Sequence, residues 1–113
     1  MGGGTPLLEE SLVLYKQLGD KIGQADTIGW LSIDHSNLDR AIAYAQEGVE
    51  LHRELGDLSG IAFSLNILAR LTMWNGDFSS PVPWLEEVLT ISRQLSDHEN
   101  EGQALMTFGT LAH

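Results

Sequence analysis

The 113-residue chain contains no cysteine, and this absence excludes several kinds of chemistry. Thiol catalysis, iron–sulfur clusters and thiolate zinc sites all require cysteine sulfur. A chain of this length buries roughly two-thirds of the surface that it exposes when unfolded, so it can fold without a disulfide or a metal. We therefore expect one domain with its own hydrophobic core, and neither a metal nor a cofactor.

Basic residues are also scarce: six Lys+Arg stand against sixteen Asp+Glu, and the formal net charge is −10. No two of the six basic residues are adjacent; they are Lys16, Lys21, Arg40, Arg53, Arg70 and Arg93. Without a basic patch, such an acidic domain repels a phosphate backbone. The charge therefore argues against nucleic acid and favours a basic or apolar protein partner.

Long apolar runs are missing as well. The longest uninterrupted apolar stretches extend over only a few residues, whereas a membrane span needs about 20. Residues 1–5 lack the basic and apolar regions of a signal peptide, and we interpret them as a flexible leader. We accordingly expect a cytoplasmic protein that has no membrane partner.

What the chain does contain is internal repetition. Three similar tripeptides each close a segment with helical character: Leu18-Gly19-Asp20, Leu55-Gly56-Asp57 and Leu95-Ser96-Asp97. The second and third are 40 residues apart, and the same shift aligns Gly29 with Ala69 and Gly109. The first and second are only 37 apart, which predicts a shortened helix after Asp20. Self-similarity at a fixed period is the signature of a repeat architecture.

Within each period, the apolar spacing predicts two helices. Leu65, Leu68, Ala69 and Thr72 follow the i, i+3, i+4, i+7 pattern of one buried face, and Leu105 begins the same pattern one repeat later. We therefore predict an all-α fold, a right-handed α-solenoid of six antiparallel helices in three hairpins. The predicted helices cover residues 6–18, 21–35, 38–55, 58–75, 80–95 and 98–112, in a single domain spanning 6–113.

Turn residues and small residues refine this prediction. Oxygen-bearing side chains at the turns are expected to cap the following helices: Asn37, Asp57, Asp77 and Asp97. Ser80 is the expected N-cap of the fifth helix, with Pro81 at its first position, where proline is tolerated. The small residues Gly29, Ala69 and Gly109 predict a close approach of neighbouring helices.

The segments 85–97, 65–69 and 75–78 together resemble tetratricopeptide repeats of the longer, 40-residue kind. The resemblance covers residues 6–113. Similar repeats occur in MalT-type bacterial regulators, in multidomain signalling ATPases and in Pins- and rapsyn-type adaptors. We call the first helix of each repeat pair a first-type helix and the second helix a second-type helix. In contrast to complete arrays, the chain begins with a second-type helix, ends with a first-type helix and has no polar capping helix. Exposed apolar end surfaces favour self-association, and we expect a homodimer.

The resemblance also implies a partner surface, because the first helix of each pair lines a concave groove in this family. The matching positions here are Asp26, Trp30, Asp34, Asn66, Arg70, Trp74, Met106 and Thr110. Tryptophan and arginine are favoured interface anchors. The alternative is that Trp30 and Trp74 only pack between hairpins. A clamp for a peptide carboxylate is not supported, because only Asn66 and Arg70 would contribute to it.

Other candidate sites are weaker. The segment 97–102 imitates the first half of a calcium loop, but the position that needs a bidentate Glu holds Phe108. His35 and His52 have nearby carboxylates but no nucleophile motif. We therefore expect no catalytic residue, and we predict a protein–protein interaction module that binds a peptide or helix. The alternatives are a ligand-sensing domain of a larger bacterial transcription or signalling protein, and a self-associating structural protein.

Overall fold

The computed structural model describes residues 5–33 and 36–111, and within these ranges all regular structure is helical. The helices are α1 (Thr5–Leu18), α2 (Lys21–Ser32), α3 (Leu38–Leu55), α4 (Leu58–Trp74), α5 (Pro81–Leu95) and α6 (His98–Leu111). The predicted all-α fold is therefore confirmed. The shortened helix after Asp20 is α2, with 12 residues against 17 in α4. It ends at Ser32 rather than at the predicted residue 35, because the backbone at Ile33 leaves the helical conformation.

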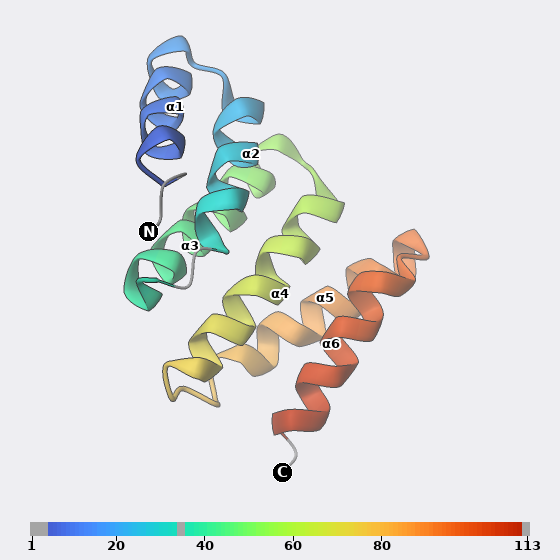
Figure 1. The fold of residues 1–113 in the computed structure, drawn as a ribbon. Helices are drawn as coiled ribbons and strands as arrows, with labels where there is room; N and C mark the ends of the chain where they lie inside the picture. Colours follow the sequence, from blue (N-terminus) through green and yellow to red (C-terminus); the bar gives the residue numbers. More distant parts are fainter. Residues whose placement is uncertain (1–4, 34–35, 112–113) are drawn as a thin grey trace.

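The helices form a solenoid-like stack in which each helix packs against the next one along the chain. Helices α2, α4 and α6 lie in one layer, with α3 and α5 behind them, and α1 and α6 occupy opposite ends (Figure 1). The molecule is elongated and thin, with extents of 41 × 31 × 19 Å. Helix α4 packs directly on α6, whereas α2 and α4 make few direct contacts and are joined through α3. The α2–α4 junction is therefore the open part of the front layer.

The three tripeptides form the same turn. Their middle residues all have left-handed backbones, with φ of 70° at Gly19, 67° at Gly56 and 57° at Ser96. In each case the N–H of the following Asp donates to a carbonyl five residues earlier, as in the Schellman ending of a helix. The side chains of Asp20, Asp57 and Asp97 then accept a hydrogen bond from the N–H three residues further on, at 3.0–3.1 Å. One turn chemistry thus ends a helix and caps the next.

The other predicted caps differ in detail. Asn37 accepts from the N–H of Arg40 at 3.0 Å, as predicted. Asp77 accepts from the N–H groups of Ser79 and Ser80, whereas Ser80 makes no side-chain cap to α5. The Ser80 hydroxyl instead donates to Asp77 Oδ2 at 2.6 Å. Helix α5 does begin at Pro81, but Asp77 rather than the Ser80 hydroxyl organises its entry.

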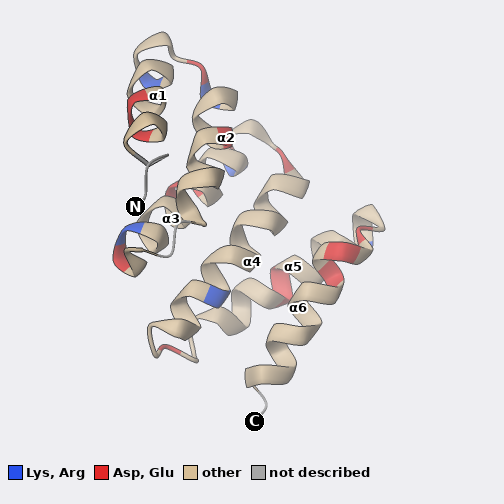
Figure 2. Cartoon of the chain, in the orientation of Figure 1, with Lys and Arg blue, Asp and Glu red and all other residues tan. Residues whose placement is uncertain are grey.

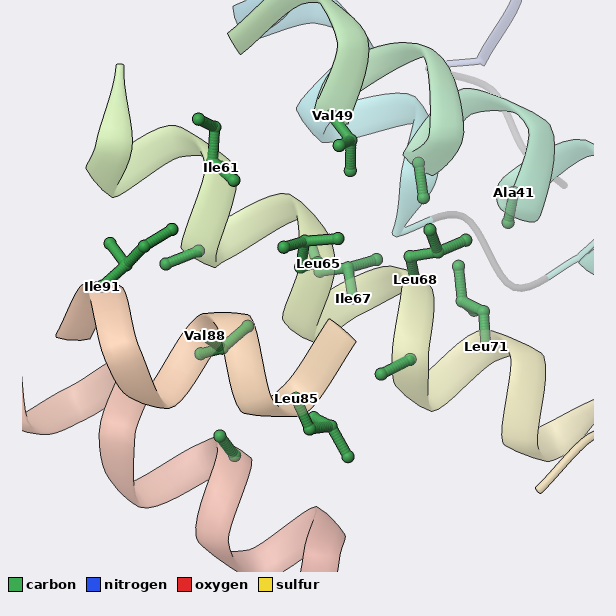
Figure 3. Close-up of a cluster of buried hydrophobic side chains, with 14 residues drawn as sticks. Ala41, Val49, Ile61, Leu65, Ile67, Leu68, Leu71, Leu85, Val88 and Ile91 are labelled. Atoms are coloured by element: carbon green, nitrogen blue, oxygen red, sulfur yellow. The ribbon is translucent and has the colours of Figure 1, made fainter. Parts of the chain in front are cut away.

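The hydrophobic core has two parts. The larger cluster is centred on α4, whose residues Leu65 and Leu68 lie between Val49 of α3 and Val88 of α5 (Figure 3). The smaller cluster joins α1, α2 and the end of α3. It consists of Leu12, Ala25, Ile28, Leu31 and Leu51. The stripe predicted on α4 is buried throughout, which confirms the periodicity from which it was derived.

The predicted close approach holds only at Ala69, which is fully buried. A Cβ added at Gly29 or Gly109 would meet nothing within 4 Å, so neither glycine is required by packing. Leu105 is exposed, contrary to its predicted place in a buried stripe. The physical reason is common to Leu105 and Gly109: none of the described helices covers this side of α6. In the described part of the chain, no helix combines the length and apolarity that crossing a bilayer requires.

Candidate functional site

The front layer carries a hollow of about 540 Å³ between α2 and the first turns of α4 and α6. Its lining includes four carboxylates, those of Asp26, Asp57, Asp97 and Glu99, and two aromatic rings, those of Trp30 and Phe63. No Lys or Arg is among the described residues that line it. We call this hollow the acidic groove.

The repeat places these groups together. Asp57 and Asp97 are the caps of α4 and α6, and both helices begin at the same end of the layer (Figure 1). Their caps therefore face the same space. Trp30 and Asp26 are one turn apart on α2 and line the same space from the side opposite α4 and α6. The groove exists because α2 and α4 are held by α3 rather than by each other.

The groove is acidic because the cations are held elsewhere. Five of the six Lys and Arg side chains lie within 4.0 Å of a carboxylate on another helix. These pairs are Lys16–Glu47, Lys21–Glu54, Arg40–Glu9, Arg53–Glu87 and Arg93–Glu101. None of these carboxylates lines the groove. In Figure 2, acidic segments mark the start of α6, and α4 carries one basic position.

Asp97 is held ionised by its neighbours. The Asn100 side chain donates to Asp97 Oδ2 at 2.7 Å and the Asn100 N–H donates to Oδ1 at 3.1 Å. These hydrogen bonds, the side-chain bond first, keep the pKa of Asp97 below its ordinary value of 3.8. Asp57 Oδ2 lies 3.2 Å from Nδ1 of His52, which also lines the groove. Asp26 and Glu99 have no ion pair within the described residues, so their charges face solvent.

A second, smaller hollow of about 220 Å³ lies toward the other end of α4 and α6. Four of the residues predicted from the family resemblance line it: Arg70, Trp74, Met106 and Thr110. Arg70 is exposed, and no described carboxylate lies within 4.0 Å of it. The predicted surface is therefore divided, since Asp26 and Trp30 belong to the acidic groove.

Asn66 does not belong to either surface. Its side chain is only 2% exposed, and its Nδ2 donates to the carbonyl and to Oδ1 of Asn100 at 3.2 and 3.0 Å. Asn66 thus joins α4 to α6 beneath the surface. Asp34, the remaining predicted position, lies outside the described residues.

Sequence reasoning missed Phe63, Glu99 and Gln103, although a signal for them was present. Phe63, Arg70 and Trp74 are related by i, i+7 and i+11 and so share one face of α4. Glu99, Gln103, Met106 and Thr110 follow the same kind of spacing on α6. If the predicted surface positions on α4 and α6 are continued by one or two turns toward the N-termini of these helices, they include residues that line the acidic groove.

No family model matches the chain, and no curated protein matches it either. In residues 5–33 and 36–111, no group of three or more His, Asp or Glu side chains is placed to hold a metal ion. What the geometry offers is a charged, partly aromatic surface on a helical scaffold.

Proposed function

We propose that this chain is a non-catalytic binding module of the tetratricopeptide kind that holds a basic peptide or helix of a partner protein in the acidic groove. The observation that carries the proposal is the lining itself: four carboxylates and two exposed aromatic rings, without a Lys or Arg. The proposal includes the expected cytoplasmic location.

The chemistry of a cationic side chain fits this lining. A guanidinium or ammonium group is attracted to the face of an aromatic ring, with about 0.5–2 kcal/mol gained per contact. Asp26 and Glu99 are available to such a cation because neither is paired with a described basic residue. Helical and extended peptides both dock into grooves by placing anchor side chains at regular spacing. A basic anchor in the acidic groove is the expected mode of recognition.

The volume of the groove supports one alternative. About 540 Å³ lies within the range of small-molecule sites, roughly 300–1,000 Å³. A small organic cation would use the same rings and carboxylates, and the chain would then be a ligand-sensing domain. Both candidates require positive charge in the ligand, and they differ in whether a peptide backbone contributes.

The test is a fluorescence-polarisation screen of labelled peptides in which lysine and arginine are moved along an otherwise neutral, mixed apolar sequence. Peptides with a basic anchor are expected to bind, and their neutral glutamine counterparts are not. Binding should weaken as salt rises, because exposed charges are screened. Competition with arginine amide and with a quaternary ammonium compound separates the peptide from the small-ligand alternative.

Two groove variants and one control complete the test. Trp30→Ala and the double variant Asp26→Asn/Glu99→Gln should each weaken binding about 3- to 30-fold. The control Asp39→Asn/Glu50→Gln removes the same charge from exposed positions of α3 and should bind like the parent. Equal loss in groove and control variants, or no preference for basic peptides, would refute the proposal.

A further inference from the structure

The second-type helices α1, α3 and α5 share one recurring apolar position, which is buried in α3 and α5 and exposed in α1. Leu14, Leu51 and Ile91 are equivalent positions, related by the shifts of 37 and 40 residues. Their exposed fractions are 58%, 8% and 6%. Leu51 and Ile91 belong to the two core clusters, whereas no described helix covers Leu14.

The first-type helices show the complementary change at the opposite end. Leu65 of α4 and Leu105 of α6 are equivalent, and their exposed fractions are 1% and 48%. Leu65 is enclosed because α4 packs between α3 and α5 (Figure 3). No described helix takes the place of α5 on the far side of α6. Among the described helices, the outer face of α1 and the outer face of α6 are therefore both left uncovered at these positions.

We propose that copies of this chain associate head to tail, with α6 of one copy packed against α1 of the next. The contact repeats the packing of α4 on α5 inside the molecule. Leu14 and Leu105 are then buried, as their equivalents are. The occupant of each exposed face is a second copy, because α6 and α1 offer each other the two helix types that pack together as α4 and α5 inside the molecule.

Charge complementarity supports the same register. Lys16 pairs with Glu47 at 3.0 Å and Arg53 pairs with Glu87 at 2.8 Å. Both pairs join one second-type helix to the next, and they occupy equivalent positions in successive repeats. The next cation in the series is Arg93, and the first carboxylate is Glu10, the equivalent of Glu47. Head-to-tail packing brings Arg93 of one copy to Glu10 of the next.

Both groups are exposed enough to reach this contact. Glu10 is exposed and has no ion pair within the described residues. Arg93 is held at the edge of the α6 face by Glu101, with Nε 2.8 Å from Oε2. Its side chain remains 61% exposed. A head-to-tail contact joins two different surfaces, so it leaves one free face at each end and can add further copies.

The experiment uses two blocking variants of the whole chain. Leu14→Glu closes the α1 face and Leu105→Glu closes the α6 face, and both positions are exposed, so helicity should be unchanged. In sedimentation velocity over a wide concentration range, the parent should grow beyond a dimer, and each variant alone should stay at 12.4 kDa. An equimolar mixture of the two variants retains one good face of each kind. It should form a dimer of twice that mass and nothing larger.

Several outcomes would overturn the proposal. A parent that stays monomeric at the highest concentration excludes the contact. Association that survives Leu105→Glu but not Leu14→Glu indicates a symmetric contact between two α1 helices. A mixture that remains monomeric excludes the pairing of α1 with α6. The charge register is checked by Glu10→Lys, which should weaken assembly, against Glu86→Lys, an exposed change on α5 that should not.

Discussion

Gly60 lies beneath the imidazole of His52, and a Cβ at position 60 would overlap His52 Nδ1. The same relationship holds one repeat earlier, where a Cβ at Gly23 would overlap the ring of Tyr15. In the third repeat the equivalent pair is Ser92 and Asn100. Where the first residue of the pair is large, as Tyr15 and His52 are, the facing position on the next helix is glycine. Where the first residue is small, as Ser92 is, the facing position holds asparagine.

Gly60→Ala should therefore destabilise the protein by about 1–3 kcal/mol, because the added methyl group forces His52 out of its position. Urea unfolding followed by circular dichroism measures the change. The double variant His52→Ser/Gly60→Ala should recover part of the loss, since serine leaves room as Ser92 does.

The matched control is Gly102→Ala in α6, where an added Cβ meets nothing within 4 Å. It should stabilise the protein by about 0.5–1 kcal/mol through helix propensity alone. If Gly60→Ala were equally stabilising, the packing of His52 on Gly60 would be wrong.

Ser96→Gly should stabilise the protein. Ser96 is the only described residue other than glycine with a positive φ, and its equivalents Gly19 and Gly56 show what this turn prefers. The left-handed conformation costs a non-glycine residue roughly 1–2 kcal/mol, less the greater freedom that glycine has when unfolded. We expect a net gain of about 0.5–1 kcal/mol in thermal or urea unfolding. Gly56→Ser is the reverse change and should lower stability; a gain from it would contradict the shared turn geometry.

Stability should fall in acid partly through Glu87. Two hydrogen bonds from Arg53, both 2.8 Å, hold the pKa of Glu87 below its ordinary value of 4.5. A carboxyl whose pKa is lower when folded stabilises the fold above the unfolded pKa and loses this effect as pH falls through the folded pKa. Glu87→Gln should therefore flatten the decline of unfolding free energy below about pH 4.5.

The expected contribution is at most about 1 kcal/mol, because both partners are partly exposed to solvent. The comparison variant is Glu86→Gln, which removes an exposed carboxylate from the same helix. Identical pH profiles for the parent and Glu87→Gln would show that the Arg53 contact is not maintained in solution.

Asn66→Ala should separate stability from binding. The side chain is buried and joins α4 to α6, so its loss leaves the Asn100 oxygens without this donor and should cost about 1–3 kcal/mol. Arg70→Glu/Trp74→Ala, on the exposed surface, should leave the unfolding midpoint nearly unchanged. The opposite order of effects would place Asn66 on the surface and the other two residues in the core.

Most of the fold could be predicted from the sequence, because the signals for its turns and helix faces are local. The Leu-Gly-Asp turns and the spacing of Leu65, Leu68 and Ala69 each determine a turn or a face without reference to distant residues. The acidic groove was harder to predict from the sequence. Its lining comes from α2 and from the first turns of α4 and α6, and the relative placement of these helices depends on α3. Asn66 and Arg70 are four residues apart on one face of α4, yet Asn66 is buried and Arg70 is exposed. The position of α6 determines this difference, and the spacing alone does not reveal it.

The division of the core has a mechanical consequence. One cluster belongs to α1, α2 and the end of α3, the other is centred on α4, and α3 is the element that the two share. The two core clusters are therefore joined through α3, and the acidic groove lies between α2 on one side and the first turns of α4 and α6 on the other. A change in the angle between these two parts would alter the width of the groove, and a ligand that contacted both α2 and α4 would oppose such a change.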